Sequence, residues 1–205
     1  MAWSGTPEAR ALYAIEDPFS YRDRLTLPKL LINACGDQFF LPDSSQFYFG
    51  ALPGPKYLRY IPNTDHSMKG SDAPRTIAAW HHAILTGAAL PKLSWHHDAG
   101  DALVVSTATR PRRAVLWRAT NPVARDFRLE TFGANWSSEP VEAKGGEIRV
   151  QVPAPAAGWT AYLVELEYDL GGPAPLKLTT EVTVTPRTLP HGSHRAERPR
   201  GFLSR

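Results

Sequence analysis

Two short apolar runs near the start of the chain predict two neighbouring buried strands. The first covers Leu30–Ala34 and the second covers Tyr57–Ile61. Apolar residues at consecutive positions are typical of strands that are buried on both faces, as in parallel sheets. Between the runs, Pro42 and Asp43 predict the start of a helix that ends at the turn residues 53–55. A strand, a helix and a strand in this order form a βαβ unit, so we expect the two strands to be parallel.

A longer helical pattern follows the second run. Ser71 or Asp72 can act as its N-cap, Pro74 lies in its first turn, and Gly87 stands at its end. Apolar positions recur at helical spacing and predict one stripe that packs on a sheet: Ile77, Trp80, His81, Ile84 and Leu85. We therefore interpret His81 as a core histidine. A shorter helix is expected earlier, around Glu8–Ile15.

Beyond Pro91 the apolar positions alternate with polar ones, and helical spacing disappears. In the segment 160–168, for example, the apolar residues share one face while Glu165 and Glu167 lie on the other. About seven short strands in this region are typical of an immunoglobulin-like sandwich, without the cysteine and tryptophan pattern of antibody domains. The strands that we expect are 93–96, 102–106, 114–118, 127–132, 148–152, 160–168 and 176–185.

Composition and charge narrow the classes of partner. The net charge of +3 equals that of the arginine-rich tail His191–Arg205, so the rest of the chain is close to neutral and shows no basic face for nucleic acid. No apolar stretch reaches the roughly 20 residues that span a bilayer. The N-terminus lacks the basic and apolar regions of a signal peptide. We therefore expect no nucleic-acid partner, no membrane span and no export of the chain as written.

Each of the two apolar runs is followed by a residue that can carry chemistry. Asp37 follows the first and His66 the second, in the chain order of the last two members of an α/β-hydrolase triad. In open α/β sheets such groups gather beyond the carboxyl ends of the strands. We expect Asp37 to accept a hydrogen bond from Nδ1 of His66, which leaves Nε2 free to take a proton from a serine. The pattern alone also permits a plainer interpretation, with Asp37 in a turn and His66 in a loop.

The residues around this pair offer no nucleophile. No G-x-S-x-G elbow, nor anything similar, precedes Asp37. Two further acids lie close by: Asp65 is expected to point away from its neighbour His66, and Asp43 is expected to cap the helix that follows it.

Other groupings carry weaker signals. His96, His97, Asp98 and Asp101 are residue types that bind metals, but we interpret 98–101 as a hairpin turn. The single cysteine, Cys35, excludes an internal disulfide and any multi-cysteine metal site. We expect no metal and no cofactor. Four tryptophans could line a carbohydrate surface, although core packing is the expected role: Trp95, Trp117, Trp136 and Trp159.

The segments around Asp37 and His66 resemble a known family. Residues 28–45 (PKLLINACGDQFFLPDSS) are similar to the acid segment of the PhoPQ-activated pathogenicity-related proteins, which include the slime-mould autocrine proliferation repressors. Residues 57–67 (YLRYIPNTDHS) are similar to the histidine segment of that family. Residues 116–119, 126–128 and 159–165 resemble its C-terminal region, so that the resemblance runs from about Asp17 to Pro186.

The resemblance implies an α/β-hydrolase-like protein in which Asp37 is the triad acid and His66 the base. The family's serine lies in a Gly-Ala-Ser-Lys-Arg-Gly-type elbow, and no position here matches it. We therefore expect the C-terminal portion of a serine-hydrolase-like protein of the esterase or peptidase type, inactive by itself. Full-length relatives would be periplasmic or secreted and act on a small-molecule or peptide substrate. The alternatives are a non-catalytic binding or signalling protein and a carbohydrate-binding sandwich.

The expected fold follows from these patterns. It is an α/β fold, the C-terminal part of an α/β-hydrolase-like parallel sheet, followed by an all-β immunoglobulin-like sandwich. We place the first domain at residues 1–92, the sandwich at 93–187 and a disordered basic tail at 188–205.

Overall fold

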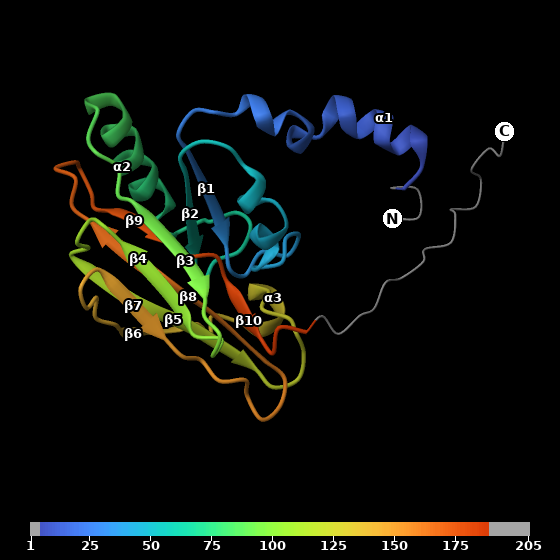
Figure 1. Cartoon of the computed structure of the whole chain (residues 1–205). Coiled ribbons are helices and arrows are strands. Elements are labelled where there is room, and N and C mark those ends of the chain that lie inside the picture. Colours follow the sequence, from blue (N-terminus) through green and yellow to red (C-terminus); the bar gives the residue numbers. More distant parts are fainter. Residues whose placement is uncertain (1–4, 189–205) are drawn as a thin grey trace.

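The computed structural model describes residues 5–188 (Figure 1). Helices are few and short, and strands dominate the second half of the chain. The helical elements are α1 (Pro7–Glu16), η1 (Pro18–Arg24), η2 (Ser44–Phe47), η3 (Phe49–Ala51), α2 (Ala73–Thr86) and α3 (Leu129–Phe132). The strands are β1 (Lys29–Ala34), β2 (Lys56–Ile61), β3 (Leu93–His97), β4 (Leu103–Thr107), β5 (Arg113–Asn121), β6 (Ser137–Pro140), β7 (Glu147–Val150), β8 (Trp159–Tyr168), β9 (Leu176–Thr179) and β10 (Thr183–Thr185).

The strands form two sheets. The larger has seven strands in the order β1-β2-β9-β8-β5-β6, with β10 also paired to β8. The smaller is an antiparallel sheet in the order β3-β4-β7. β1 and β2 are parallel, in a register that runs from Lys29 opposite Lys56 to Ala34 opposite Ile61, which confirms the expected pairing of these two strands. All other pairings between the named strands are antiparallel.

The expected fold class, a parallel α/β-hydrolase-like sheet followed by an immunoglobulin-like sandwich, is wrong. β2 pairs on its other side with β9, antiparallel, where Leu58 lies opposite Thr179. Strands from both halves of the chain therefore share one mixed sheet. The physical reason is that a continuous apolar run reports burial on two faces and says nothing about the direction of the neighbouring strand. A strand inside a mixed sheet can also be buried on both faces.

The connection between β1 and β2 is not the expected helix but two short 3₁₀ turns, η2 and η3. Tyr48, between them, has φ −137° and ψ −28°, outside the helical region. Aromatic residues in this segment lose side-chain freedom in a helix, and Gly50 adds backbone entropy to the cost. The connection therefore breaks into turns that place Phe49 in the core.

Helix α2 begins and ends as expected, but it buries a different face. Ser71 accepts a hydrogen bond from the backbone N–H of Ala73, and Gly87 ends the helix with φ 67°. The buried residues are mostly small and bring α2 close to β9: Ala73, Thr76, Ala79, Trp80 and Ala83. In the expected stripe Ile77, Ile84 and Leu85 are exposed. His81 is exposed too, so its interpretation as a core histidine is wrong.

The strands after Pro91 agree with the expected pattern in most places. The expected strand at 127–132 is instead the short helix α3, because the Asp126 carboxylate accepts the backbone N–H of Arg128 and turns the chain. The expected strand at 176–185 is divided into β9 and β10, and β6 was not expected. In β8 the expected apolar face packs in one core, while Glu165 and Glu167 lie on the opposite face, as expected. The apolar face consists of Tyr162, Val164, Leu166 and Tyr168.

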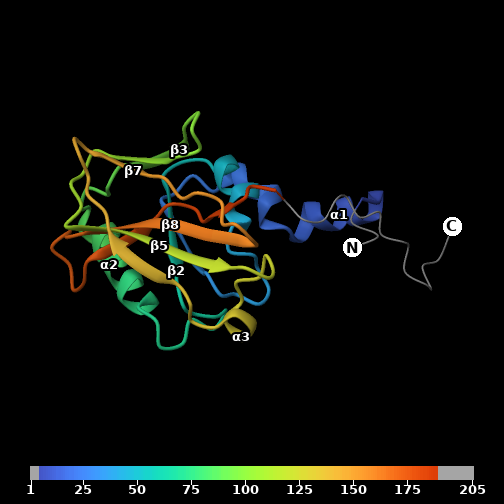
Figure 2. The same cartoon turned by 90° about the horizontal axis from the view of Figure 1, so that it is seen from below.

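Two apolar cores lie on the two faces of the larger sheet. One packs this sheet against α2 and the smaller sheet, and includes Trp80, Val105 and Leu166. The other lies beneath the β1–β2 connection and α3, and includes Cys35, Tyr60 and Phe127. Figures 1 and 2 show α2 over one face of the larger sheet, with α1 projecting away from both sheets. Cys35, which directly follows β1, and Tyr60 on β2 thus anchor in the second core the strand ends that precede Asp37 and His66.

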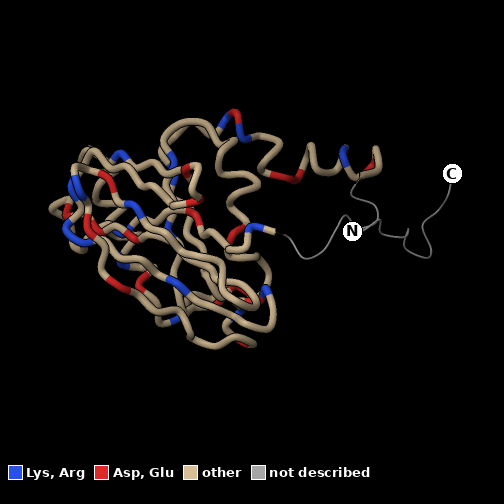
Figure 3. The backbone as a smooth tube through the Cα atoms, turned by 60° about the horizontal axis from the view of Figure 1, so that its bottom comes forward, with Lys and Arg blue, Asp and Glu red and all other residues tan. Residues whose placement is uncertain are grey.

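Two properties of the described residues concern partners. No helix within 5–188 has the length and apolar character needed to cross a membrane. Basic and acidic residues are interspersed along the folded body (Figure 3). The basic tail expected at 188–205 lies almost wholly outside the described residues.

Candidate functional site

Asp37 and His66 are hydrogen-bonded to each other. Nδ1 of His66 lies 2.8 Å from Oδ2 of Asp37. Asp37 follows β1 and His66 follows β2, and since these strands are parallel neighbours, their carboxyl ends lie side by side. The two residues are 29 positions apart in the chain, so it is the parallel pairing that brings them together.

The carboxylate of Asp37 is fixed on both sides. Its Oδ1 accepts the backbone N–H groups of Phe39 at 2.7 Å and Phe40 at 3.1 Å, while Oδ2 faces His66. Burial raises the pKa of Asp37, but the hydrogen bonds from His66, Phe39 and Phe40 outweigh it and hold the pKa below its usual value. The carboxylate is therefore ionised at neutral pH and acts only as an acceptor. Nδ1 of His66 must then carry the proton of the shared hydrogen bond.

Gly36 sets the distance between the two strand ends. Its N–H donates to the carbonyl of Thr64, and its carbonyl accepts from the N–H of Leu129 at the start of α3. A Cβ at this position would lie 2.8 Å from the Thr64 oxygen and 2.9 Å from the Leu129 nitrogen. Only glycine allows the backbone to pass so close to both neighbours. Gly36 thereby locks the segment before His66 against the segment before Asp37.

The imidazole of His66 is open to solvent on its far side. Its side chain is 49% exposed, and within residues 5–188 no hydrogen bond involves Nε2. The ring of Phe39 meets it edge-on at a centroid distance of 5.0 Å, and that of Phe40 lies at 6.0 Å. Phe39, Phe40 and Leu41 are themselves more than half exposed. We call these three residues the apolar rim.

This arrangement can move a proton. A carboxylate on Nδ1–H fixes the tautomer in which Nε2 carries a lone pair, and it stabilises the imidazolium that forms when Nε2 takes a proton. Among the described residues, no serine, threonine or cysteine is hydrogen-bonded to Nε2.

Comparison with known proteins places the chain in a family. The profile of the PhoPQ-activated pathogenicity-related proteins matches residues 1–128, more than half of the chain. The chain belongs to this family. The resemblance noted around Asp37 and His66 is thus confirmed, and both residues lie within the matched region.

A curated relative supports the same assignment. Autocrine proliferation repressor protein A of Dictyostelium discoideum is 33% identical over 221 residues, which cover 94% of this chain and 45% of the relative. The chain therefore spans less than half the length of that relative. No solved structure matches the chain.

The two nearby acids of this PhoPQ-related chain have structural partners. Oδ1 of Asp65 accepts the backbone N–H and the hydroxyl of Ser67, which turns the loop and keeps Asp65 off the imidazole. Asp43 makes no side-chain cap, contrary to expectation. It forms a buried ion pair with Arg125, with Oδ2 2.5 Å from Nη2. Arg125 was missed by sequence reasoning because it lies in an irregular, polar segment that suggests solvent exposure.

The metal-like residue types form a turn, as expected. Oδ1 of Asp98 accepts the N–H groups of Gly100 and Ala102, and Asp101 has φ 61°. Across the part of the chain that the structure describes, no group of three or more His, Cys, Asp or Glu could hold a metal ion. Cys35 is fully buried and free, and burial raises the pKa of its thiol, so it is unreactive.

The four tryptophans do not form one surface. Trp95 lines a cavity with Phe49 and Tyr57, whereas Trp117 lines a different cavity beside Arg59. Trp136 is buried in the core, and Trp159 packs against the same core. A continuous sugar-binding platform built from these residues is therefore not present in the described structure.

A buried charge network was also missed from the sequence. Arg59 on β2 donates to Glu165 on β8 and to both carboxylate oxygens of Asp72, before α2. Lys177 on β9 contacts the same Asp72 at 2.7 Å. The available signal was Arg59 itself, a charged residue inside an apolar run, since such a residue is almost never buried unpaired.

Proposed function

We propose that Asp37 and His66 are the acid and base of a serine-hydrolase-type site whose nucleophile lies outside residues 5–188. The observation that carries the proposal is the 2.8 Å hydrogen bond from Nδ1 of His66 to a carboxylate that two backbone N–H groups also hold. A residue in a turn or loop without such a role needs neither this orientation nor an exposed Nε2. The relative's length supports the proposal, because more than half of that protein lies outside the match.

The chemistry would run as in other acyl transfers. Nε2 of His66 takes the proton of a serine hydroxyl while the serine oxygen attacks the acyl carbon of the substrate, and Asp37 stabilises the imidazolium. The imidazolium then returns the proton to the leaving group, and an ester to the serine remains. Water attacks this ester with Nε2 again as the base, which releases the acid and restores the serine.

The experiment joins the chain to a nucleophile. In a chimera, this chain replaces the matching portion of the Dictyostelium relative, and a fluorophosphonate probe reports any activated serine. We expect labelling, and we expect His66→Gln to slow it about 100-fold or more, since general-base catalysis contributes that much. His81→Gln is the matched control, because His81 is exposed on α2 and makes no hydrogen bond to Asp37 or His66 within the described residues. A folded chimera that stays unlabelled, or one in which His66→Gln labels normally, would contradict the proposal.

A binding or signalling role is the second candidate, and the apolar rim favours it. Three consecutive large apolar side chains exposed beside one polar pair are typical of an interaction surface. The name of the relative, an autocrine proliferation repressor, describes such a role for that protein. Adding the purified chain to proliferating Dictyostelium cells tests it: slower growth that is lost in Phe39→Ser but kept in His66→Gln supports binding without catalysis.

A further inference from the structure

A cavity of about 580 Å³ lies between β3 and the connection from β1 to β2. One wall is formed by residues 91–95, at the start of β3. Glu181 contributes to the lining, and the opposite wall belongs to the connection and the start of β2: Gln46, Phe49, Gly50 and 54–57. The volume lies within the range of roughly 300–1,000 Å³ that is usual for ligand clefts. We call this space the edge groove.

One edge of β3 has no partner strand within the described residues. β3 pairs only with β4, at the end of the smaller sheet (Figure 1). The Ala108 N–H donates to the carbonyl of Lys92, so the even-numbered residues of β3 direct their main-chain groups towards β4. The N–H and C=O groups of Leu93 and Trp95 therefore point away from β4. Across residues 5–188 these groups make no hydrogen bond.

This unpaired edge borders the edge groove. Leu93 and Trp95 both line the groove, and no residue of β4 does. An extended backbone that lies in the groove would therefore meet a donor and an acceptor at every second residue of β3. Addition of a strand to an open sheet edge is a common way to bind a peptide, because the main-chain hydrogen bonds supply affinity for any sequence.

Aromatic rings give the edge groove an apolar surface. Phe49 stacks on Trp95, with a centroid distance of 5.6 Å and an interplanar angle of 17°. Tyr57 on β2 lines the same groove and is half-buried, as is Trp95. An apolar side chain placed beside these rings would be removed from water, which favours binding.

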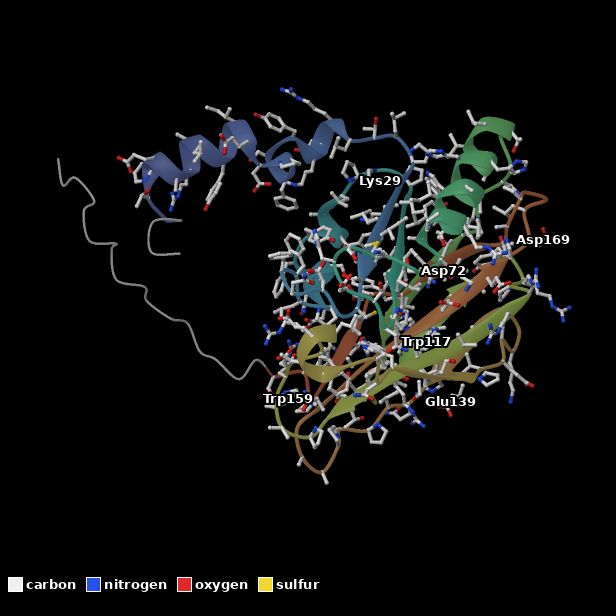
Figure 4. The ribbon with its side chains drawn as sticks, turned by 180° about the vertical axis from the view of Figure 1, so that it is seen from behind. Lys29, Asp72, Trp117, Glu139, Trp159 and Asp169 are labelled. Carbon is white, nitrogen blue, oxygen red and sulfur yellow. The ribbon has the colours of Figure 1, made fainter. Side chains whose placement is uncertain are left out.

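The wall opposite β3 is held by two lysines. Nζ of Lys56 donates to the carbonyls of Gly50 and Leu52, at 2.8 Å in each case. Nζ of Lys29 donates to the carbonyl of Pro53 at 2.5 Å. Figure 4 shows Lys29 at the start of β1. A wall that is fixed before a ligand arrives reduces the ordering cost of binding.

The charges in the lining do not favour a charged ligand. Lys56 is already held by two carbonyls. Lys92 and Glu181 have opposite charges, and neither side chain forms an ion pair with a described residue. These two free charges cancel, so recognition rests on the main chain and the apolar surface.

We propose that the edge groove binds an extended peptide as an additional antiparallel strand on β3, with one apolar side chain against Phe49 and Trp95. Both pairings within the smaller sheet are antiparallel, the more stable arrangement per residue. The peptide residue that exchanges hydrogen bonds with Trp95 points its side chain to the same face as Trp95, where Phe49 lies. The proposal is independent of the proposed function, because neither Asp37 nor His66 lines the groove.

The experiment measures the binding of defined peptides to the full chain by fluorescence anisotropy. The probes are four fluorescein-labelled heptapeptides, Thr-Thr-Thr-X-Thr-Thr-Thr, with Val, Leu, Phe or Trp at X. Threonine favours an extended backbone. We expect at least one probe to bind saturably and to bind at least about 10-fold more tightly than the matched peptide with Ser at X, because only the former buries an apolar side chain.

Backbone methylation of the best peptide tests the main-chain pairing. In the proposed register the N–H of X faces β3, whereas the N–H of the threonine after it points away. An N-methyl group on X should weaken binding at least about 5-fold, the equivalent of one hydrogen bond. An N-methyl group on the following threonine should leave the affinity almost unchanged. Equal effects of the two methyl groups would contradict the register.

A variant that fills the edge groove tests its position. Gly50 lines the groove, and nothing lies within 4 Å of its Cβ position. We expect Gly50→Trp to abolish saturable binding of the best peptide, with Gly50→Ala as the matched control that keeps it. In the wild type, the peptide should shift the amide NMR resonances of Leu93 and Trp95.

Three results would overturn the proposal. The first is the absence of saturable binding with all four peptides. The second is binding that Gly50→Trp leaves intact. The third is a dimer in which a second copy of the chain protects the Leu93 and Trp95 amides from hydrogen exchange, because the edge would then pair with the chain itself.

Discussion

The guanidinium of Arg59 on β2 reaches Glu165 on β8 across the strand β9 that lies between them, with Nη1 2.5 Å from Oε2. Both side chains are almost fully buried. Glu165→Ala leaves the buried Arg59 with Asp72 as its remaining carboxylate partner and one guanidinium donor without its carboxylate, so it is expected to lower the free energy of unfolding by about 1–3 kcal/mol. Urea denaturation of the wild type and the variant measures this difference.

The control is an ion pair at the surface of the same sheet. Arg118 on β5 and Glu139 on β6 lie 3.6 Å apart, and both are about half exposed. Water screens such a pair, so Glu139→Ala should change the stability by under about 1 kcal/mol. Similar losses in the two variants would mean that the Arg59–Glu165 pair is solvated in solution.

Gly36→Ala is expected to destabilise the chain by about 1–3 kcal/mol, the usual cost of overpacking. The added methyl group would meet the Thr64 oxygen and the Leu129 nitrogen, both backbone atoms that cannot move alone. Gly50→Ala is the matched control, because nothing lies within 4 Å of its Cβ position. Thermal unfolding of both variants measures the difference, and equal melting temperatures would show that the strand ends are less tightly joined.

The stability of the chain should fall at low pH partly through Asp126. Hydrogen bonds from the Arg128 side chain, more than enough to offset burial, lower the pKa of Asp126 to about 2, and the Arg128 N–H and Thr131 hydroxyl add to this effect. The unfolded value is about 3.9. The contribution is therefore complete above about pH 4 and is lost as the pH falls towards 2. Asp126→Asn should flatten the decline of stability between pH 4 and pH 2 in urea titrations, and an unchanged slope would contradict this assignment.

Asp37→Asn should change the tautomer of His66. The wild-type carboxylate accepts only, so the neutral imidazole carries its proton on Nδ1, whereas an amide leaves this preference weak. The ¹⁵N chemical shifts of the two ring nitrogens at pH 8 measure the tautomer ratio. Asp65→Asn is the control, since Asp65 adjoins His66 in sequence but binds Ser67. A wild-type spectrum dominated by the Nε2–H tautomer would exclude the proposed proton path.

The site was more predictable from the sequence than the fold around it. A residue that directly follows a strand must lie at the end of that strand. The parallel pairing of β1 with β2 depends only on these two strands and the short segment that connects them. These facts were enough to place Asp37 beside His66. The neighbour of β2 on its other side, β9, lies more than a hundred residues later, and no periodicity reports such a pairing or its direction.

The burial of charged residues was the second feature that the sequence did not predict. Glu165 was expected opposite the apolar face of its strand, which is correct, but it is buried there against Arg59 and not exposed to solvent. The buried face of α2 was predicted wrongly for a related reason. Its alanines allow a close approach to β9, and closeness of packing decided against the larger side chains of Ile77 and Ile84.

In the turn after Asp37 the backbone and the side chains have different roles. Phe39 and Phe40 hold the carboxylate through their backbone N–H groups, and their rings take no part in those bonds. Any residue except proline can supply the same donors. The exposed side chains of this turn can therefore diverge among homologues without loss of the acid's orientation, so that the surface beside the Asp37–His66 pair can change while the pair itself is inherited intact.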